Sequence, residues 1–263
     1  MERALTALVT NDDGIDSPGL HRLAQAALDA GLELLIAAPA SEASGSSASI
    51  TVAQEDGRIL YERRGLAGLD GVTAFAVEAG PGLITLLAGH GTFGPTPDLV
   101  LSGINRGINV GQVVLHSGTV GAALTGGVNG LRALAVSQEA PTGSEVLDWT
   151  AASALAQQVI PRLAEQPRGT VLNLNVPISA GDTLPELRAA TLAEFGVAQT
   201  TATERDEGAD DHVRLAVSSP SARPRPGSDA ALLADGYATL TAIRSVTEDP
   251  AVALEDLVSQ IRG

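Results

Sequence analysis

The chain has 263 residues, of which 44% are hydrophobic, and its formal net charge is −15 at pH 7. The acidic balance argues against binding to nucleic-acid polymers or to an anionic membrane. The absence of cysteine and lysine excludes disulfides, thiolate catalysis, Schiff bases and lysine-dependent phosphate loops. No apolar run approaches the roughly 20 residues of a membrane span. We therefore expect a cytoplasmic protein that needs a local cation if it acts on phosphates.

Strand-like and helix-like segments alternate over the first two thirds of the chain. Apolar runs typical of buried strands cover residues 4–10, 32–38, 74–77, 98–102, 134–137 and 170–175. Helical patterns cover residues 17–30, 82–88, 118–131 and 145–165. A hairpin is expected from residues 50–52 and 58–64, joined by residues 54–57. The alternation predicts an α/β fold with a doubly wound, mostly parallel sheet.

The pattern changes after Pro177. Residues 185–228 are polar and contain proline, with β-like runs at 189–195 and 212–217 and an acidic turn at 204–211 between them. These features predict a protruding β-hairpin, followed by a strand at 237–243 and a terminal helix at 252–261. We expect a single domain over residues 1–263, with residues 185–245 as an extension. Because the extension is too polar for a core of its own, it would be stabilised by packing on a neighbouring subunit.

Asn11, Asp12, Asp13 and Gly14 directly follow the first apolar strand. Ligands in open α/β sheets bind at the carboxyl ends of the strands, so these carboxylates lie where chemistry is expected. Two adjacent negative charges repel, and a divalent cation with oxygen ligands is the simplest way to offset that repulsion. The alternative interpretation is an Asx-turn with a helix cap, which the same residue types favour.

Three further loops after strands are rich in glycine and hydroxyl residues: 39–47, 102–111 and 116–121. With Asp12 and Asp13 they supply the oxygen ligands that hard cations prefer. Ser117 and Thr119 stand at a helix start, where hydroxyls and backbone N–H groups can bind an anion. A metal site next to an anion site indicates a phosphate ester as substrate.

These segments together resemble the SurE family of metal-dependent 5′/3′-nucleotidases. The resemblance lies in Asn11-Asp12-Asp13-Gly14, the loop from Ala38-Pro39 to Ser44-Gly45, the glycine-rich and asparagine-rich segment 102–111, and Ser117-Gly118-Thr119-Val120. Residues 172–177 and 235–237 match later family segments. The resemblance implies a Rossmann-like core, a C-terminal extension exchanged within a homodimer or homotetramer, and one divalent ion per subunit, Mg²⁺ or Mn²⁺.

The resemblance also assigns roles to individual residues. The implied metal ligands are Asp12, Asp13, Ser44 and Asn105. The implied substrate-binding residues are Asn11, Asn109, Ser117, Gly118 and Thr119. Asp12, Asp13, Asn109 and Ser117 are the expected catalytic residues. The chain departs from the family pattern at Ala40 and Ser41, at residues 79–83 and at Thr125. The metal ligands are unaffected by these departures, which leave substrate recognition and subunit contacts open.

The expected activity is therefore hydrolysis of nucleoside 5′-monophosphates to nucleoside and phosphate. Whether 3′-monophosphates are substrates as well stays open at this point. Two alternatives remain at this point: a nucleotide- or metal-binding regulator with weakened turnover, and a phosphatase of non-nucleotide substrates such as polyphosphate. His116, next to Ser117, could protonate the leaving alkoxide, although such a histidine is more often an ordinary loop residue.

Overall fold

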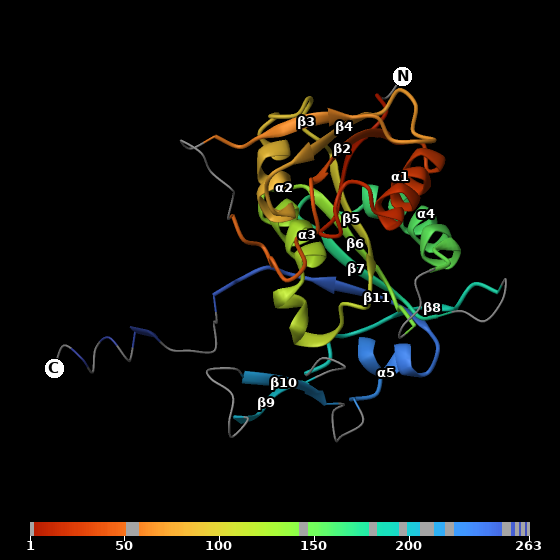
Figure 1. Cartoon of the computed structure of the whole chain (residues 1–263). Coiled ribbons are helices and arrows are strands. Elements are labelled where there is room, and N and C mark those ends of the chain that lie inside the picture. Colours follow the sequence, from red (N-terminus) through yellow and green to blue (C-terminus); the bar gives the residue numbers. More distant parts are fainter. Residues whose placement is uncertain are drawn as a thin grey trace.

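The computed structural model describes residues 3–50, 58–141, 147–178, 183–194 and 224–248, the backbone of 199–205 and 213–218, and residues 254, 255, 258 and 261 near the C-terminal end (Figure 1). Its strands are β1 (Thr6–Thr10), β2 (Glu33–Pro39), β3 (Tyr61–Arg64), β4 (Thr73–Val77), β5 (Leu99–Arg106), β6 (Arg132–Gln138), β7 (Val171–Val176), β8 (Leu187–Ala189), β9 (Gln199–Arg205), β10 (Val213–Ser218) and β11 (Ala238–Ile243). Its helices are α1 (Pro18–Asp29), α2 (Pro81–Gly89), the 3₁₀ helix η1 (Gly111–His116), α3 (Gly118–Val128), α4 (Thr150–Ala164) and α5 (Asp229–Ala234).

Nine of these strands form one sheet in the order β3-β4-β2-β1-β5-β6-β7-β11-β8. The six strands from β4 to β7 are parallel to their neighbours, whereas β3 and β11 pair antiparallel with β4 and β7. The chain winds outward in one direction from β1 to β2 and in the other from β5 to β6 and β7. The strand order therefore reverses between β1 and β5, and this is the place where open α/β sheets bind their ligands.

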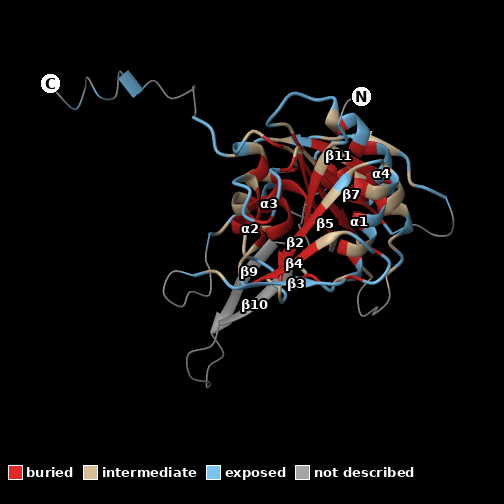
Figure 2. Ribbon diagram, turned by 90° about the horizontal axis from the view of Figure 1, so that it is seen from above, coloured by how far each residue is buried: buried red, intermediate tan, exposed pale blue. Residues whose placement is uncertain are grey.

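Helices cover both faces of the sheet, because side chains alternate along each buried strand. One apolar cluster joins α1 and α4 to strand residues such as Val9 and Leu101, and the other joins α2 and α3 to residues such as Leu8 and Val100. Figure 2 shows the buried residues concentrated along the sheet and on the inner sides of these helices. The predicted doubly wound, mostly parallel sheet is confirmed.

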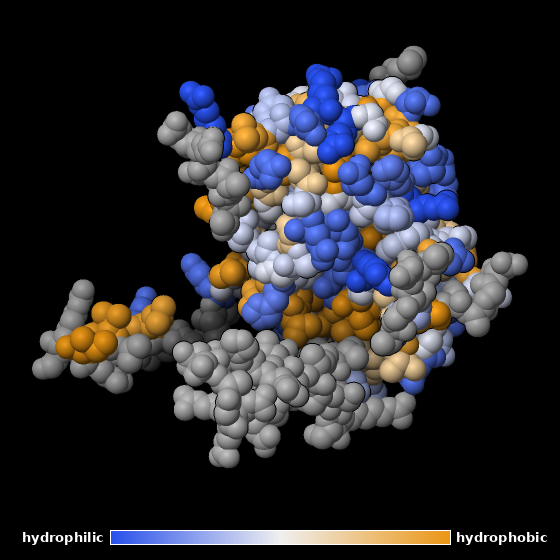
Figure 3. All heavy atoms as spheres, in the orientation of Figure 1, coloured by the Kyte–Doolittle hydropathy of each residue, from blue (hydrophilic) through white to orange (hydrophobic). Residues whose placement is uncertain are grey.

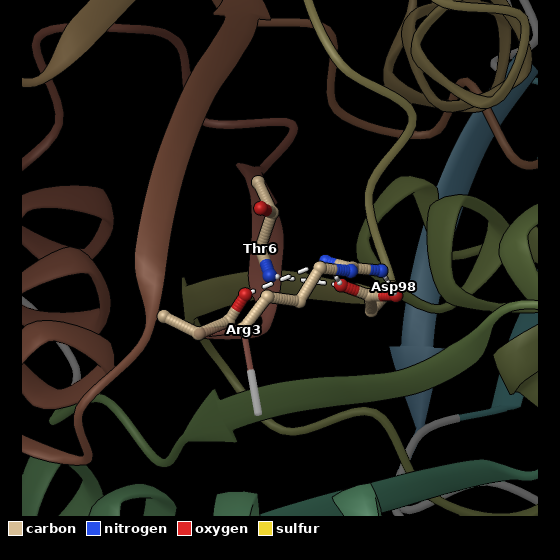
Figure 4. Close-up of polar contacts among 4 residues, drawn as sticks. Arg3, Thr6 and Asp98 are labelled. Carbon is tan, nitrogen blue, oxygen red and sulfur yellow. Dashed lines mark hydrogen bonds and ion pairs between the residues drawn. The ribbon is translucent and has the colours of Figure 1, made fainter. Parts of the chain in front are cut away.

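The amino ends of β1 and β5 are tied together at the edge of the sheet opposite the carboxyl ends. The guanidinium of Arg3 donates to both carboxylate oxygens of Asp98, at 2.7 and 2.6 Å, and the Thr6 N–H donates to Asp98 Oδ2 at 3.0 Å (Figure 4). The Arg3 hydrogen bonds hold the pKa of Asp98 below its usual value. This pair links the chain segments that lead into the two central strands.

Several elements differ from the expectations. β3 pairs with β4, with Tyr61 opposite Val77, and residues 51–57 of the expected hairpin lie outside the described part of the chain. The C-terminal hairpin exists, but its first strand is β9 rather than residues 189–195, because β8 runs parallel to β11 in the main sheet. Residues 204 and 205 of the expected acidic turn belong to β9, and the rest of that turn and most of the expected terminal helix lie outside the described residues. The sequence patterns did not predict η1 or α5, which are short.

The described helices include none that is long and apolar enough to cross a membrane.

Candidate active site

A cavity of about 530 Å³ opens at the carboxyl ends of the central strands, where the strand order reverses. The residues that line it come from the loops after β1 and β2, from the end of β5 and the loop after it, from η1, and from the starts of α1, α3 and α4. They are Asp12, Asp13, Ser17, Pro18, Gly19, Glu42, Ser44, Gly45, Asn105, Arg106, Asn109, Val113, His116, Ser117 and Trp149. Six of the residues expected from the sequence are therefore brought to one cavity: Asp12, Asp13, Ser44, Asn105, Asn109 and Ser117.

Asp12, in the loop after β1, is fixed by hydrogen bonds from α3 and from the loop after β2. Its carboxylate is buried and accepts a hydrogen bond from the Thr119 hydroxyl, and its backbone oxygen accepts from the Ala43 N–H at 2.7 Å. Gly118 allows this close approach, because a Cβ there would lie 2.7 Å from Asp12 Oδ2. Burial raises the pKa of Asp12, and the Thr119 hydrogen bond opposes that rise.

Asp13 is half-buried beside Asp12. Burial and the neighbouring Asp12 charge raise the pKa of Asp13 to about 6, although a hydrogen bond from the Arg106 backbone opposes the shift. Among the described residues, Asp13 Oδ2 is buried without a hydrogen-bond partner. A buried carboxylate oxygen without a donor is costly, and a cation would satisfy it.

The other two expected metal ligands have side chains whose orientation suits a cation. The Ser44 hydroxyl donates to Glu42 Oε1 at 2.7 Å, which leaves the lone pairs of its oxygen free. The Asn105 amide nitrogen donates to the Gly107 carbonyl at 2.7 Å, which leaves its Oδ1 as the free acceptor. Glu42 adds a third carboxylate to the cavity lining and contributes to the raised pKa of Asp13.

Asn109 is fixed by three residues of neighbouring strands. Its carbonyl accepts from Asn173 at 2.8 Å and from Asn175 at 2.9 Å, and its N–H donates to Asn175 Oδ1 at 2.7 Å. Its side-chain Nδ2 donates to Ser137 Oγ at 2.8 Å. Asn173, Asn175 and Ser137 are all fully buried. This clamp holds the loop after β5 at the cavity wall.

Ser117 caps α3, since its hydroxyl accepts from the Val120 N–H at 3.1 Å. Gly118 and Thr119 lie behind the cavity lining, and their N–H groups belong to the first turn of the helix. Asn11 also lies behind the lining: its Nδ2 donates to the Gly14 carbonyl at 3.0 Å and to Ser17 Oγ at 2.6 Å. In the structure, the Asn11 side chain and the Thr119 hydroxyl therefore form hydrogen bonds to other groups of the protein.

The donor set fits a hard divalent cation. Among the described residues, no group of three or more His, Cys, Asp or Glu side chains is placed to hold one metal ion. Two carboxylates, one hydroxyl and one amide side chain line the same cavity, and oxygen ligands of these kinds suit Mg²⁺ or Mn²⁺.

The lining residues that the sequence patterns missed include Ser17, Glu42 and Trp149. Ser17 begins a predicted helix just after Asp12 and Asp13, and Glu42 lies in a loop already singled out, so proximity to predicted ligands was the available signal. Trp149 was detectable only as the single tryptophan of the chain. The patterns also missed Asn173 and Asn175 as supports, although polar residues at alternate positions of a buried strand were visible.

Known proteins resemble this chain in sequence and in fold. A family model described as Survival protein SurE matches residues 7–205. A protein named 5′-nucleotidase SurE from Rhodopirellula baltica is 35% identical over 261 residues, covering 97% of this chain and 96% of its own. One of the same name from Solidesulfovibrio magneticus is 38% identical over 258 residues, with 97% and 96% covered. The crystal structure of the Sure protein from Aquifex aeolicus, 23% identical, shares the fold with a TM-score of 0.78 over 97% of this chain and 99% of that one.

Proposed function

The chain belongs to the SurE family, and on that premise we propose that it is a divalent-metal-dependent phosphomonoesterase that hydrolyses nucleoside 5′-monophosphates to nucleoside and phosphate. The observation that carries the proposal is the meeting of Asp12 and Asp13, at the end of β1, with Asn105 of the neighbouring β5 and with the start of α3 in one cavity. A cation site and a helix start that can bind an anion lie together there, as a phosphate ester requires.

We propose that Asp12, Asp13, Ser44 and Asn105 hold one divalent ion, Mg²⁺ or Mn²⁺. The burial of Asp12 and the unpartnered Oδ2 of Asp13 support this assignment, because a cation stabilises a buried carboxylate oxygen that has no hydrogen-bond donor. When bound, such an ion polarises a phosphoryl oxygen and lowers the pKa of a water molecule. A carboxylate oxygen of Asp13 that does not bind the ion would accept the proton of the attacking water.

The phosphoryl group would lie between this ion and the start of α3. The backbone N–H groups of Gly118 and Thr119 and the hydroxyl of Ser117 would donate to its oxygens as charge redistributes in the transition state. Asn109 Nδ2 carries a second hydrogen beyond the one given to Ser137, and that hydrogen would reach the same anion. Asn11 would act indirectly, by holding the turn that carries Asp12 and Asp13.

We also propose that the chain forms a homodimer or homotetramer through its 185–245 extension, within a single domain over residues 1–263. β9 and β10 pair with each other and form a sheet apart from the nine-stranded one. In Figure 1 they lie below the main body, and isolated two-stranded hairpins are only marginally stable. Figure 3 shows apolar surface at the same end of the main body, and Val113 and Leu115 of η1 are exposed.

The activity is tested by measuring phosphate release from AMP with the full chain in Mg²⁺ or Mn²⁺, against the same reaction in excess chelator. We expect turnover that requires the ion and that Asp12→Asn nearly abolishes, with an unchanged circular-dichroism spectrum. A panel of 3′-AMP, ribose 5-phosphate and short polyphosphate defines the range of substrates. Full activity in the presence of chelator would contradict the proposal.

A further inference from the structure

The single tryptophan of the chain lies in the wall of the candidate active site. Trp149 immediately precedes α4 and lines the same cavity as Asp12, Asp13 and Ser117. Its side chain is half-buried and packs against the core cluster formed by α1 and α4. Aromatic residues make up only 2% of the chain, so an aromatic side chain at this place is notable on composition alone.

The backbone on both sides of Trp149 is anchored. The side chain of Gln138, the last residue of β6, donates to the Asp148 carbonyl, and the Thr150 N–H donates to Asp148 Oδ1 at 2.9 Å. The Trp149 carbonyl accepts from the Ser153 N–H at 2.9 Å, within the first turn of α4. The backbone around Trp149 is anchored and its side chain is partly packed, so the side chain loses little conformational freedom when a ligand binds.

The lining carries two chemically different kinds of side chain. Asp12, Asp13, Asn105 and Ser117 are anionic or polar, whereas Trp149 offers the one aromatic ring among the lining residues. The cavity volume, about 530 Å³, lies within the range of roughly 300–1,000 Å³ that small-molecule ligands occupy. A phosphate group and a sugar hydroxyl use the polar side chains, and the indole ring suits a flat ring.

We propose that the indole of Trp149 is the stacking surface for the nucleobase, and that it makes nucleotides, rather than sugar phosphates or polyphosphate, the preferred substrates of this site. This inference rests on the proposed phosphomonoesterase function and specifies its substrate class. Base–aromatic stacking tolerates any base, because every base has a π face, so Trp149 favours nucleotides as a class without selecting among them.

The experiment compares AMP with ribose 5-phosphate, which carries the same phosphoryl group and lacks the base. We expect Trp149→Leu to lower the ratio of kcat/KM for AMP to that for ribose 5-phosphate roughly five- to 150-fold, mainly through KM, because base stacking contributes equally to ground state and transition state. Trp149→Phe, which keeps a π face, should restore most of the ratio. Val128→Ala, an exposed apolar residue that does not line the cavity, is the control.

A ratio that Trp149→Leu leaves unchanged, or an equal loss for both substrates, would overturn the inference, since either shows that the ring acts only in packing. Binding is measured separately by the fluorescence of this single tryptophan in Mg²⁺, excited where adenine does not absorb. AMP should quench it, and ribose 5-phosphate and inorganic phosphate should not. If the protein hydrolyses neither ester, the proposed function fails while this titration still decides the stacking, and equal responses to all three ligands would reject it.

Discussion

Thr119 Oγ1 donates a hydrogen bond to Asp12 Oδ1 inside the protein, behind the cavity that Asp12 lines. The two residues come from different elements, α3 and the loop after β1, so the contact joins the helix start that we propose to bind the anion to the carboxylate that we propose to bind the cation. The sequence pattern placed Thr119 among the phosphate contacts. In the structure its hydroxyl is committed to Asp12, and only its backbone N–H remains for a substrate.

We therefore expect Thr119→Val to weaken binding of Mn²⁺ by roughly tenfold or more, because partners that orient a metal ligand typically matter at that level. The valine keeps the volume and removes the donor, and the pKa of Asp12 rises further as a result. Thr119→Ser keeps the donor and should bind the ion nearly as well as the wild type. Calorimetric titration with Mn²⁺ measures both, and equal affinities for Val and Ser would show that the hydrogen bond is not needed.

Asp229 links the C-terminal extension to the cavity wall. Its fully buried carboxylate accepts hydrogen bonds from the N–H groups of Gly111 at 2.8 Å, Ala193 at 2.9 Å and Ala230 at 2.8 Å. Asp229→Ala leaves these donors unpaired, and we expect the free energy of unfolding to fall by roughly 2–4 kcal/mol. Because Gly111 begins η1, which carries Val113 and His116 to the cavity, kcat/KM for AMP should fall too.

The control for this change is Asp70→Asn, at an exposed carboxyl, which should alter neither quantity. Urea denaturation and steady-state kinetics supply the two readouts. A stable Asp229→Ala protein with full activity would mean that the extension is not needed to position η1.

The raised pKa of Asp13 predicts a pH-dependent stability of the metal-free protein. The folded state binds the Asp13 proton more tightly than the unfolded chain, so stability falls as the pH rises from the ordinary pKa of 3.8 through about 6. In chelator, Asp13→Asn should be more stable than the wild type above pH 6, by roughly 1–2 kcal/mol once solvent screening of this half-buried group is included. Near pH 4 the two should be equally stable.

Urea denaturation of both proteins across this pH range tests the expectation, and taking their difference cancels the titration of groups that do not interact with Asp13. Mn²⁺ added at pH 7.5 should raise the stability of the wild type more than that of Asp13→Asn, because the ion binds the folded state and needs the carboxylate. A difference that stays constant with pH would show that Asp13 titrates normally.

Gly121 lets the loop after β2 lie directly on α3. A Cβ at this position would lie 2.5 Å from the backbone carbon of Ser47, and backbone cannot move aside as easily as a side chain. We expect Gly121→Ala to lower the free energy of unfolding by roughly 1–3 kcal/mol, even though alanine favours a helix over glycine by about 1 kcal/mol. Metal affinity should fall as well, since Ser44 lies in the displaced loop.

Gly65→Ala is the matched control, because a Cβ there meets no atom within 4 Å and the residue is not in the left-handed region. Thermal unfolding and Mn²⁺ titration of the two variants separate packing from a general effect of alanine. Equal stability of both variants would argue that the loop moves away at no cost.

The proposed assembly makes its own prediction. Deleting residues 197–216 and joining the ends with a short Gly-Ser turn removes most of the β9–β10 hairpin, which should yield a monomer or insoluble protein with reduced activity. Sedimentation velocity gives the mass and phosphate release gives the activity. A deletion variant that keeps the assembly of the full chain, with undiminished turnover, would show that the hairpin is only a surface element.

The sequence by itself determined the elements of the core and most of the proposed metal site. Buried parallel strands and amphipathic helices repeat with local periodicities. Asp12, Asp13 and Ser44 follow strands, Asn105 lies at the end of β5, and the carboxyl ends of these strands meet at one edge of the sheet. Ser117 was visible as a cap for the same local reason. These inferences needed only neighbouring residues and the general rule for open sheets.

Only the tertiary structure decided which partner each side chain takes. β3 pairs with β4 although the nearer segment looked like its hairpin partner, because strand pairing is set by the whole sheet. Thr119 bonds Asp12, Asp229 reaches Gly111, and Trp149 comes to the cavity wall from the start of α4. Such contacts join residues far apart in the chain, and because they depend on the packing of several elements, no local periodicity or spacing records them.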